Sequence, residues 1–321
     1  MAITINTNLS SQIVQANLNK STTALNQAIE RMTTGYKINH ASDNAAGYSI
    51  ARSWEAKLGS LDVAADNAAT GADMLSTLED HYALISTHVQ RVRDLTEQAA
   101  NGTYGSQSKS AIQEEIRARL DEINRIAANC EFGGVDLMKG ADAPIYLQVG
   151  LDSDMTKSGI KLSENLFAKG DIQSLFKITG TKSYTPITVE DLTAEEKEGK
   201  TAPQQEALAT EKALAKISKE CAGLGGAGEK TAAEMLERID QVINTISNRV
   251  TTLGAAQNRV ESAIESIAVQ SENITSSLST LRDADVAQES SNFLKAQILQ
   301  QASATLLATA NQSPSIALNL L

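Results

Sequence analysis

The sequence has few aromatic side chains, which make up 3% of its 321 residues, whereas hydrophobic residues of all kinds reach 41%. Its apolar content is therefore mainly Ala, Val, Ile and Leu. Large rings usually fill wide protein interiors, so their scarcity argues against a thick globular core. Small aliphatic side chains are better suited to narrow seams between helices.

Proline is also scarce, and its four positions leave two long stretches without it. Residues 1–143 contain none, and neither do residues 204–313. Because proline breaks helix interiors, both stretches are free to form long helices.

Excess positive charge is missing too. The formal net charge of −11 argues against a nucleic-acid partner, which requires a concentrated basic face. Residues 1–19 lack the positive and apolar regions of a secretory signal, so export would use a route without a cleaved N-terminal signal. The tail 296–321 is uncharged but rich in Gln, Asn, Ser and Thr, so we expect no membrane span.

Patterns for catalysis or metal binding are missing as well. We find no nucleophile–base pair, metal-ligand spacing or phosphate-binding loop, and we expect neither an enzyme nor a bound cofactor or metal. His81 and His88 are seven residues apart without a third ligand nearby, which favours a solvated or partly packed pair. Cys130 and Cys221 lie far apart in the sequence, which argues against a disulfide framework.

The sequence does contain a heptad pattern near its C-terminus. Alternate steps of three and four from Leu236 to Leu281 reach fourteen positions, and twelve of them are apolar. Six heptads of this kind predict one long helix with a coiled-coil seam. Gln257 and Ser271 are the two polar positions.

The N-terminal half carries matching apolar stripes. The same spacing runs through residues 61–99, and the glycines at 102 and 105 then interrupt the helix. Residues 112–126 mark a second helix, which should run antiparallel to the first. An earlier stripe over residues 14–32 predicts an N-terminal helix.

The middle of the chain follows a different pattern. Residues 132–184 alternate short apolar segments with Gly, Asp and Ser, which predicts strands and hairpins. Residues 189–230 are charged and Ala-rich, then Gly-rich, and should form an insertion with one or two short helices. The predicted fold is mainly α: a long antiparallel coiled-coil helical bundle formed by the N- and C-terminal segments, with a small β-containing middle region and a variable insertion.

Both chain ends lack charge. Residues 1–19 and 296–321 contain no charged side chain, although charge is a common way to keep a helix solvated. One helix pair cannot bury all the apolar faces of such ends, so other copies must cover the rest. In a monomer the ends should stay disordered, because the apolar area they bury alone does not offset the entropy of ordering. The predicted self-assembly seam comprises Leu18, Leu25, Met32, Ile264, Ile267, Ile274, Leu278, Leu281, Ile298 and Leu306.

Motifs at both ends resemble those of bacterial flagellins. The resemblance covers residues 1–176 and 231–321, and it leaves the segment between them unmatched. The motifs are MAITINTN at residues 1–8, RMTTGYKIN at 31–39, SDNAAG at 42–47, QRVRDL at 90–95, FGGV at 132–135, LRDAD at 281–285, AQILQQA at 296–302 and ANQ at 310–312.

The resemblance implies a subunit that polymerises into the flagellar filament, a secreted, extracellular structure that serves swimming motility. The implied partners are further copies of the chain, the flagellar type III apparatus that exports it unfolded, an export chaperone, the filament cap and hook-junction proteins. The implied division is into inner-tube terminal helices (1–45 and 280–321), an outer-tube helical bundle with β-hairpins (46–176 and 231–279) and a variable surface-exposed insertion (177–230).

The resemblance also implies recognition by a flagellin-sensing Toll-like receptor. By motif match, the recognition patch would consist of Gln90, Arg91, Asp94, Leu95 and Glu115. Two alternative functions stay open. A hook–filament junction protein would share the terminal helices but occur in few copies. A secreted coiled-coil effector or signalling module would fold as a monomer and tolerate trimming of its ends.

Overall fold

The computed structural model describes residues 8–140, 144–152, 154–176, 192–197, 201–224 and 231–318. The chain divides into two compact units. Unit 1 comprises Met1–Ser60 and Val269–Leu321, and unit 2 comprises Leu61–Ala268. Both boundaries fall inside long helices, α2 (Ala45–Ala100) and α8 (Ala232–Arg282), and not at the predicted junctions 45/46 and 279/280.

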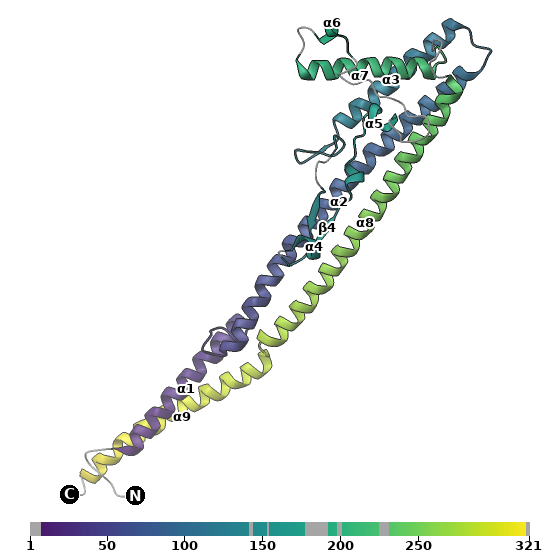
Figure 1. The fold of residues 1–321 in the computed structure, drawn as a ribbon. Coiled ribbons are helices and arrows are strands. Elements are labelled where there is room, and N and C mark those ends of the chain that lie inside the picture. Colours follow the sequence, from purple (N-terminus) through teal and green to yellow (C-terminus); the bar gives the residue numbers. More distant parts are fainter. Residues whose placement is uncertain are drawn as a thin grey trace. The chain divides into compact units, whose positions relative to one another are not determined.

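In unit 2, α2 and α8 lie side by side and antiparallel (Figure 1). Arg93 Nε donates a hydrogen bond to Asp240 Oδ1 at 2.7 Å, and Gln257 Nε2 donates to Glu79 Oε2 at 2.8 Å. Residues early in this part of α2 therefore meet residues late in α8. The predicted antiparallel pairing of the two chain halves is confirmed.

The stripe predicted on α2 is the buried face with which this helix contributes to unit 2. Every position that the spacing selects between residues 61 and 99 is buried. After Leu61 come three small members, and the larger ones follow between residues 75 and 92, where more elements pack around the helix. These positions are Leu61, Ala64, Ala68, Gly71, Leu75, Leu78, Tyr82, Ile85, Val89, Val92, Thr96 and Ala99.

The seam of α8 deviates from the heptad prediction. Val242 and Ala256 are buried, whereas the predicted Ile243 and Gln257 are only half-buried. A two-stranded coiled coil buries one narrow stripe, but a helix that packs on several elements buries a wider face. The remaining predicted seam residues that are buried are Ile239, Ile246, Leu253, Val260 and Ile267.

A third helix, α3 (Ser106–Ala128), follows the predicted break after Ala100 and runs back along α2. Arg91 on α2 forms an ion pair with Glu115 on α3, with 2.8 Å between Nη2 and Oε1. The residues of α3 that are buried are Ile112, Ile116, Leu120, Ile123, Ile126 and Ala127.

The middle region forms two small antiparallel sheets, as predicted. β1 (Glu131–Phe132) pairs with β2 (Val135–Asp136) across a turn in which Gly133 and Gly134 both have positive φ. Because other residues rarely adopt that conformation, glycine fits this turn. The second sheet pairs β3 (Tyr146–Gln148) with β4 (Gly159–Lys161). The other short elements are α4 (Met155–Ser158), η1 (Glu164–Phe167) and α5 (Ile172–Phe176).

The β3–β4 sheet docks on α2 at a glycine. A Cβ atom on Gly71 would lie 2.4 Å from Leu147 Cδ1, so Leu147 occupies the space that a side chain there would need. Asn67 Nδ2 also donates a hydrogen bond to the carbonyl oxygen of Gln148 at 3.2 Å. The small residue on α2 thus lets the hairpin approach the helix closely.

Replacing Gly159 by Ala should destabilise unit 2 by about 1–3 kcal/mol. The new Cβ atom would lie 2.5 Å from the carbonyl oxygen of Met155, which belongs to the backbone and has little freedom to move. The free energy of unfolding from urea denaturation measures this effect. Gly254→Ala in α8 is the matched control. A Cβ atom there meets nothing within 4 Å, so helix propensity should raise stability by about 0.5–1 kcal/mol. Equal stability of the two variants would contradict the predicted clash.

The segment 177–230, predicted to be an insertion with one or two short helices, is partly described by the structure. This segment contains α6 (Ala194–Lys197) and α7 (Ala202–Cys221), and α7 packs against α3. Ala209, Ala213, Ile217 and Cys221 recur every four residues and form one buried face. The abundance of charge and alanine concealed this stripe in the sequence. Residues 177–191, 198–200 and 225–230 lie outside the described part.

Unit 1 is built on α1 (Leu9–Thr34) and α9 (Val286–Leu318), which lie side by side in Figure 1. Three polar contacts set their antiparallel register. Asn8 Nδ2 donates to the carbonyl oxygen of Ala310 at 2.7 Å, Gln300 Nε2 donates to Thr22 Oγ1 at 3.2 Å, and Arg31 Nη1 donates to Glu289 Oε1 at 3.1 Å. The predicted N-terminal helix is confirmed.

Candidate assembly surface

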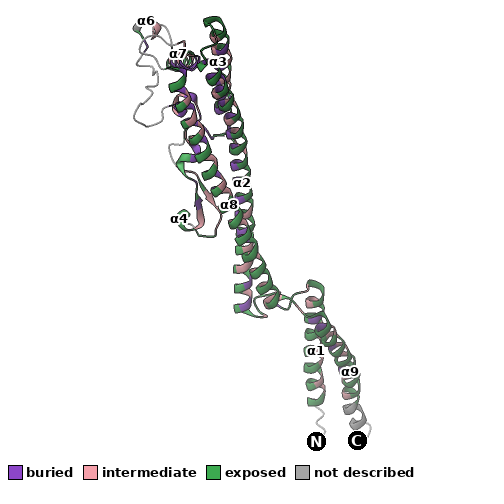
Figure 2. Ribbon diagram, turned by 90° about the vertical axis from the view of Figure 1, so that its right-hand side faces the viewer, coloured by how far each residue is buried: buried purple, intermediate pink, exposed green. Residues whose placement is uncertain are grey.

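Few residues of the two terminal helices are buried within the chain. Ala28 is the one buried residue of α1, whereas the shorter α3 buries six. Among residues 286–312 of α9, Glu289, Ala296 and Ser303 are buried, and most of both helices is exposed in Figure 2. Small residues allow the helices to approach closely, but they remove little apolar area from water.

Large apolar side chains of both helices are therefore left exposed. Ile298 is 64% exposed and Leu306 is 57% exposed. A row of exposed apolar residues of this size marks an interaction surface in a soluble protein. We call the following set the assembly surface: Leu9, Ile13, Ile29 and Met32 on α1, and Val286, Leu294, Ile298, Leu299 and Leu306 on α9.

A compact junction fixes the ends of α1 and α8. Gly35, with φ of 75°, ends α1, and its carbonyl oxygen accepts a hydrogen bond from the amide of Ala284 at 2.8 Å. The Arg282 guanidinium pairs with Glu55 and lies over the Tyr36 ring, 4.1 Å from its centroid. The orientations of the chains that leave α1 and α8 are thus set within unit 1.

The loop before α2 is held by one carboxylate. Asp43 Oδ2 accepts hydrogen bonds from the backbone amides of His40 at 3.0 Å and Asn39 at 3.1 Å. The His40 amide contributes most to lowering the pKa of the Asp43 carboxyl. A charged carboxylate is therefore favoured here, and it gives the loop between α1 and α2 a defined conformation.

The predicted seam residues fall into three groups. Leu18 and Leu25 are half-buried residues of α1, the helix that packs along α9. Met32, Ile298 and Leu306 belong to the assembly surface. The remaining five lie on α8: Ile264 and Ile267 in unit 2, and Ile274, Leu278 and Leu281, all half-buried, in unit 1.

Two residues of the assembly surface on α1, Leu9 and Ile29, were not selected from the sequence. They lie off the heptad stripe predicted for residues 14–32, which marks one face of the helix only. For Leu9 the available signal was the lack of charge in residues 1–19, which indicates that faces beyond the stripe are also to be buried. Ile29 is followed by Glu30 and Arg31 and carries no such signal.

Two family models match the chain at its two ends. The bacterial flagellin N-terminal helical region matches residues 5–143, and the bacterial flagellin C-terminal helical region matches residues 236–321. The chain belongs to the bacterial flagellin family. Flagellin is a structural protein, the subunit of the extracellular flagellar filament.

Full-length relatives agree with this assignment. The flagellin is 31% identical over 376 residues to polar flagellin F of Vibrio parahaemolyticus and 33% identical over 383 residues to polar flagellin A of the same organism, covering 100% of each chain. The crystal structure of Bacillus cereus flagellin is also similar, with a TM-score of 0.41 and 23% identity, over 66% of this chain and 94% of that one.

The predicted receptor patch of the flagellin is only partly at the surface. Gln90, Arg91 and Asp94 are exposed on α2, and Arg91 forms its ion pair with Glu115. Leu95 is 2% exposed and belongs to the core of unit 2, so its side chain is not available at the surface of the single chain. A motif match identifies positions in the sequence but does not report which face of the helix they occupy.

His81 and His88 are not part of a cluster of metal-ligating side chains in the part of the chain that the structure describes. His81 Nδ1 lies 2.8 Å from the carbonyl oxygen of Thr77 on its own helix. Within the described ranges of this flagellin, no group of three or more His, Cys, Asp or Glu side chains is arranged to hold a metal ion. No helix in that same part of the chain combines the length and apolar content needed to cross a membrane.

The two thiols of the flagellin should resist alkylation in the folded state. Both cysteines are free and buried, and burial raises the pKa of Cys130 to about 11 and that of Cys221 to about 12. At pH 8 the thiolate fraction should be more than about 100-fold below that of an ordinary cysteine. Mass spectrometry after iodoacetamide treatment, with and without guanidinium, measures this protection. Alkylation of either thiol in the native chain at the denatured rate would contradict it.

Proposed function

We propose that this flagellin polymerises through the assembly surface, which neighbouring copies cover in the filament. The observation that supports this most is that α1 buries only Ala28 within its own chain. Full burial of one Leu or Ile side chain contributes about 1.5–3 kcal/mol. Covering the nine residues of the assembly surface would therefore contribute a large favourable free energy that a single chain does not obtain.

We further propose that α1 and α9 order only when copies associate. Fixing one residue's backbone costs roughly 1–2 kcal/mol in conformational entropy, and these helices contain 26 and 33 residues. Their mutual contact buries mainly small side chains and cannot offset that cost. Unit 2 has a continuous apolar core and should fold without partners.

The proposed cellular route follows from membership of the flagellin family. The chain would be secreted unfolded by the flagellar type III apparatus and added at the filament end, beneath a cap and beyond the hook-junction proteins. An export chaperone would bind the chain before assembly. The exposed apolar residues of α9 support this proposal, since an unassembled chain with such a surface is prone to premature association.

We also propose a second, receptor-binding role for Gln90, Arg91 and Asp94 on α2 with Glu115 on α3. Three of these side chains are exposed, and the Arg91–Glu115 ion pair brings both helices into one surface. Arg91→Ala in the monomer should abolish signalling by a flagellin-sensing Toll-like receptor. Arg125→Ala, which removes another exposed arginine near the end of α3, is the matched control. Unchanged signalling by Arg91→Ala would rule out this role.

Seeded assembly tests the proposed polymerisation. Purified chain, mixed with filament fragments, should give long tubular filaments in electron micrographs. Removal of residues 1–30 or 296–321 should abolish them while circular dichroism still shows the helices of unit 2. Monomers that persist in the intact chain would overturn the proposal, and a folded monomer indifferent to trimming would favour a secreted effector. Short structures that stop after a few copies would favour a hook–filament junction protein.

A further inference from the structure

Charged residues are rare on the terminal helices, and most of them meet in one place. α1 carries Lys20, Glu30 and Arg31, and α9 carries Glu289 and Lys295. All but Glu30 line a groove of about 370 Å³ between the two helices. Glu30 lies elsewhere and contacts His40, with 2.8 Å between Oε1 and Nε2.

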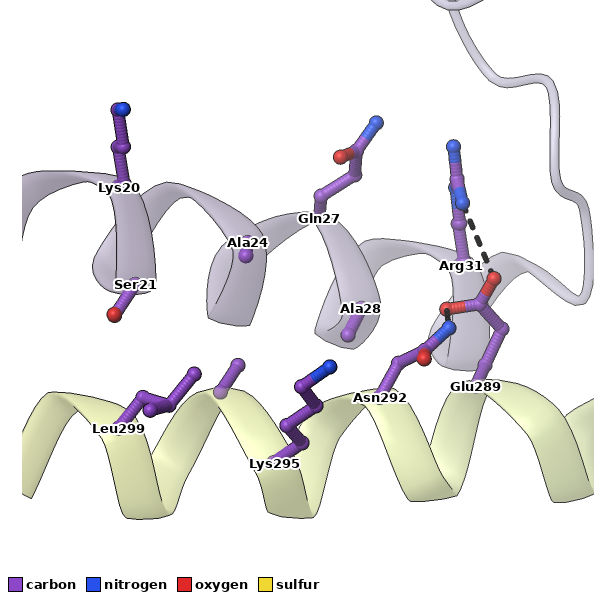
Figure 3. A pocket seen from close by; sticks show the side chains of 11 residues that line it. Lys20, Ser21, Ala24, Gln27, Ala28, Arg31, Glu289, Asn292, Lys295 and Leu299 are labelled. Carbon is purple, nitrogen blue, oxygen red and sulfur yellow. Dashed lines mark hydrogen bonds and ion pairs between the residues drawn. The ribbon is translucent and has the colours of Figure 1, made fainter. Parts of the chain in front are cut away.

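The negative charge of this groove is already matched. Glu289 Oε1 pairs with Arg31 Nη1 at 3.1 Å, and Glu289 Oε2 accepts a hydrogen bond from Asn292 Nδ2 at 3.3 Å. The Glu289 side chain is only 10% exposed. Figure 3 shows this cluster at one end of the groove, with Lys295 extending from α9 toward α1, and Lys20 extending from the side of α1 that faces away from α9.

The two lysines are not matched. Lys20 and Lys295 are exposed, and neither has an acidic partner among the residues that the structure describes. With Arg31 and Glu289 cancelling each other, the groove carries two uncompensated positive charges. Leu299 also lines the groove and belongs to the assembly surface, so a copy that covers that surface covers the lysines as well.

We propose that a second copy of the chain presents carboxylate side chains to Lys20 and Lys295, at least one to each ammonium group, when the copies assemble. The inference rests on the proposed polymerisation. Enclosing ammonium groups without an opposite charge costs several kcal/mol per ion, so the covering copy must supply one. The chain has 39 acidic and 28 basic residues, and its surface therefore offers carboxylates in excess. Asn292 and Gln27 also line the groove, and each keeps one amide hydrogen for a carboxylate beside the hydrogen bond it donates to Glu289 or to Asp43.

Zero-length cross-linking of wild-type filaments tests which group enters the groove. Carbodiimide joins lysines only to carboxylates in direct contact, and filaments made from equal amounts of 15N-labelled and unlabelled chain identify links between copies. We expect Lys20 or Lys295 in peptides that join a labelled to an unlabelled chain. Filaments whose cross-links omit both lysines, or contain them only within one chain, would overturn the inference and leave the proposed polymerisation intact. Absence of wild-type filaments would overturn both.

Charge reversal measures the contribution of the pair to assembly. Lys20→Glu with Lys295→Glu should raise the critical concentration for seeded assembly by about tenfold or more. The control variant, Lys157→Glu with Lys161→Glu, changes the net charge equally at exposed positions of unit 2. It should raise the critical concentration much less. Circular dichroism of the monomers verifies that unit 2 is folded in both. Equal critical concentrations for the two double variants would overturn the inference, whatever their common value.

Discussion

Replacing Ile298 by Asp should abolish filament formation while leaving the isolated chain folded. Ile298 is 64% exposed in the single chain, so the new carboxylate stays solvated there. Burial beneath a neighbouring copy would remove that solvation, and Lys295, three residues earlier on α9, would offset only part of the resulting cost of several kcal/mol for every subunit added. Sedimentation after seeded assembly gives the amount of polymer, and thermal unfolding gives the stability of the monomer.

The control for this variant is Ile298→Leu, which keeps the side chain apolar and similar in volume. It should assemble with a critical concentration close to that of the wild type, since such exchanges cost less than about 1.5 kcal/mol even in packed cores. Filaments of Ile298→Asp at wild-type yield would show that α9 is not covered at this position.

Replacing Ile239 by Asp should instead unfold unit 2 in the monomer, whereas Ile298→Asp affects assembly alone. Ile239 is fully buried in the core that α8 shares with α2 and α3. An unpaired carboxylate there should lower the free energy of unfolding by about 4 kcal/mol or more at pH 7. Loss of helical circular dichroism and faster proteolysis of residues 61–268 provide the measurement.

The pH dependence of the stability of Ile239→Asp shows whether the loss of stability comes from the charge of the carboxylate or from the change in side-chain shape. Burial raises the pKa of the introduced Asp above its unfolded value of about 3.9, so the deficit in stability is largest above that folded pKa. It should shrink as the pH falls through the folded pKa, because the protonated acid is cheaper to bury. Gln241→Asp, two residues away at an exposed position, should change stability by less than about 0.5 kcal/mol. A deficit at Ile239 that is the same at all pH values would contradict this explanation.

The core of unit 2 was predictable because its main stripe is a local property of the sequence. The 3–4 spacing from Leu61 to Ala99 determines which face of α2 is apolar, and that face is buried throughout. The same reasoning was less accurate for α8. Whether Val242 or Ile243 lies deeper depends on how many elements surround the helix, and spacing within one helix does not contain that information.

The burial of Leu95 and of α7 was not predicted from the sequence. In both cases burial is decided by the elements that pack on these residues. Leu95 lies in the core of unit 2, and Ile217 of α7 joins the same core. Tertiary contacts of this kind are not visible in a motif or in the charge of a segment.

The assembly surface could be predicted in kind but not residue by residue. The lack of charge at both ends indicated burial beyond a two-helix pair, and Met32, Ile298 and Leu306 are exposed in the single chain. The groove that holds Lys20 and Lys295 could not be predicted, because it depends on the register of α1 against α9. That register is set by contacts between distant residues such as Asn8 and Ala310.

Amide hydrogen exchange in the monomer and in the filament tests most directly whether polymerisation completes a fold that the single chain leaves unfinished. Residues 9–34 and 286–312 should exchange quickly in the monomer and become as slow as α3 in the filament, because neighbours then cover both helices. Unit 2 should be protected in both states. Terminal helices that are equally protected in monomer and filament, or that still exchange quickly in the filament, would contradict this conclusion.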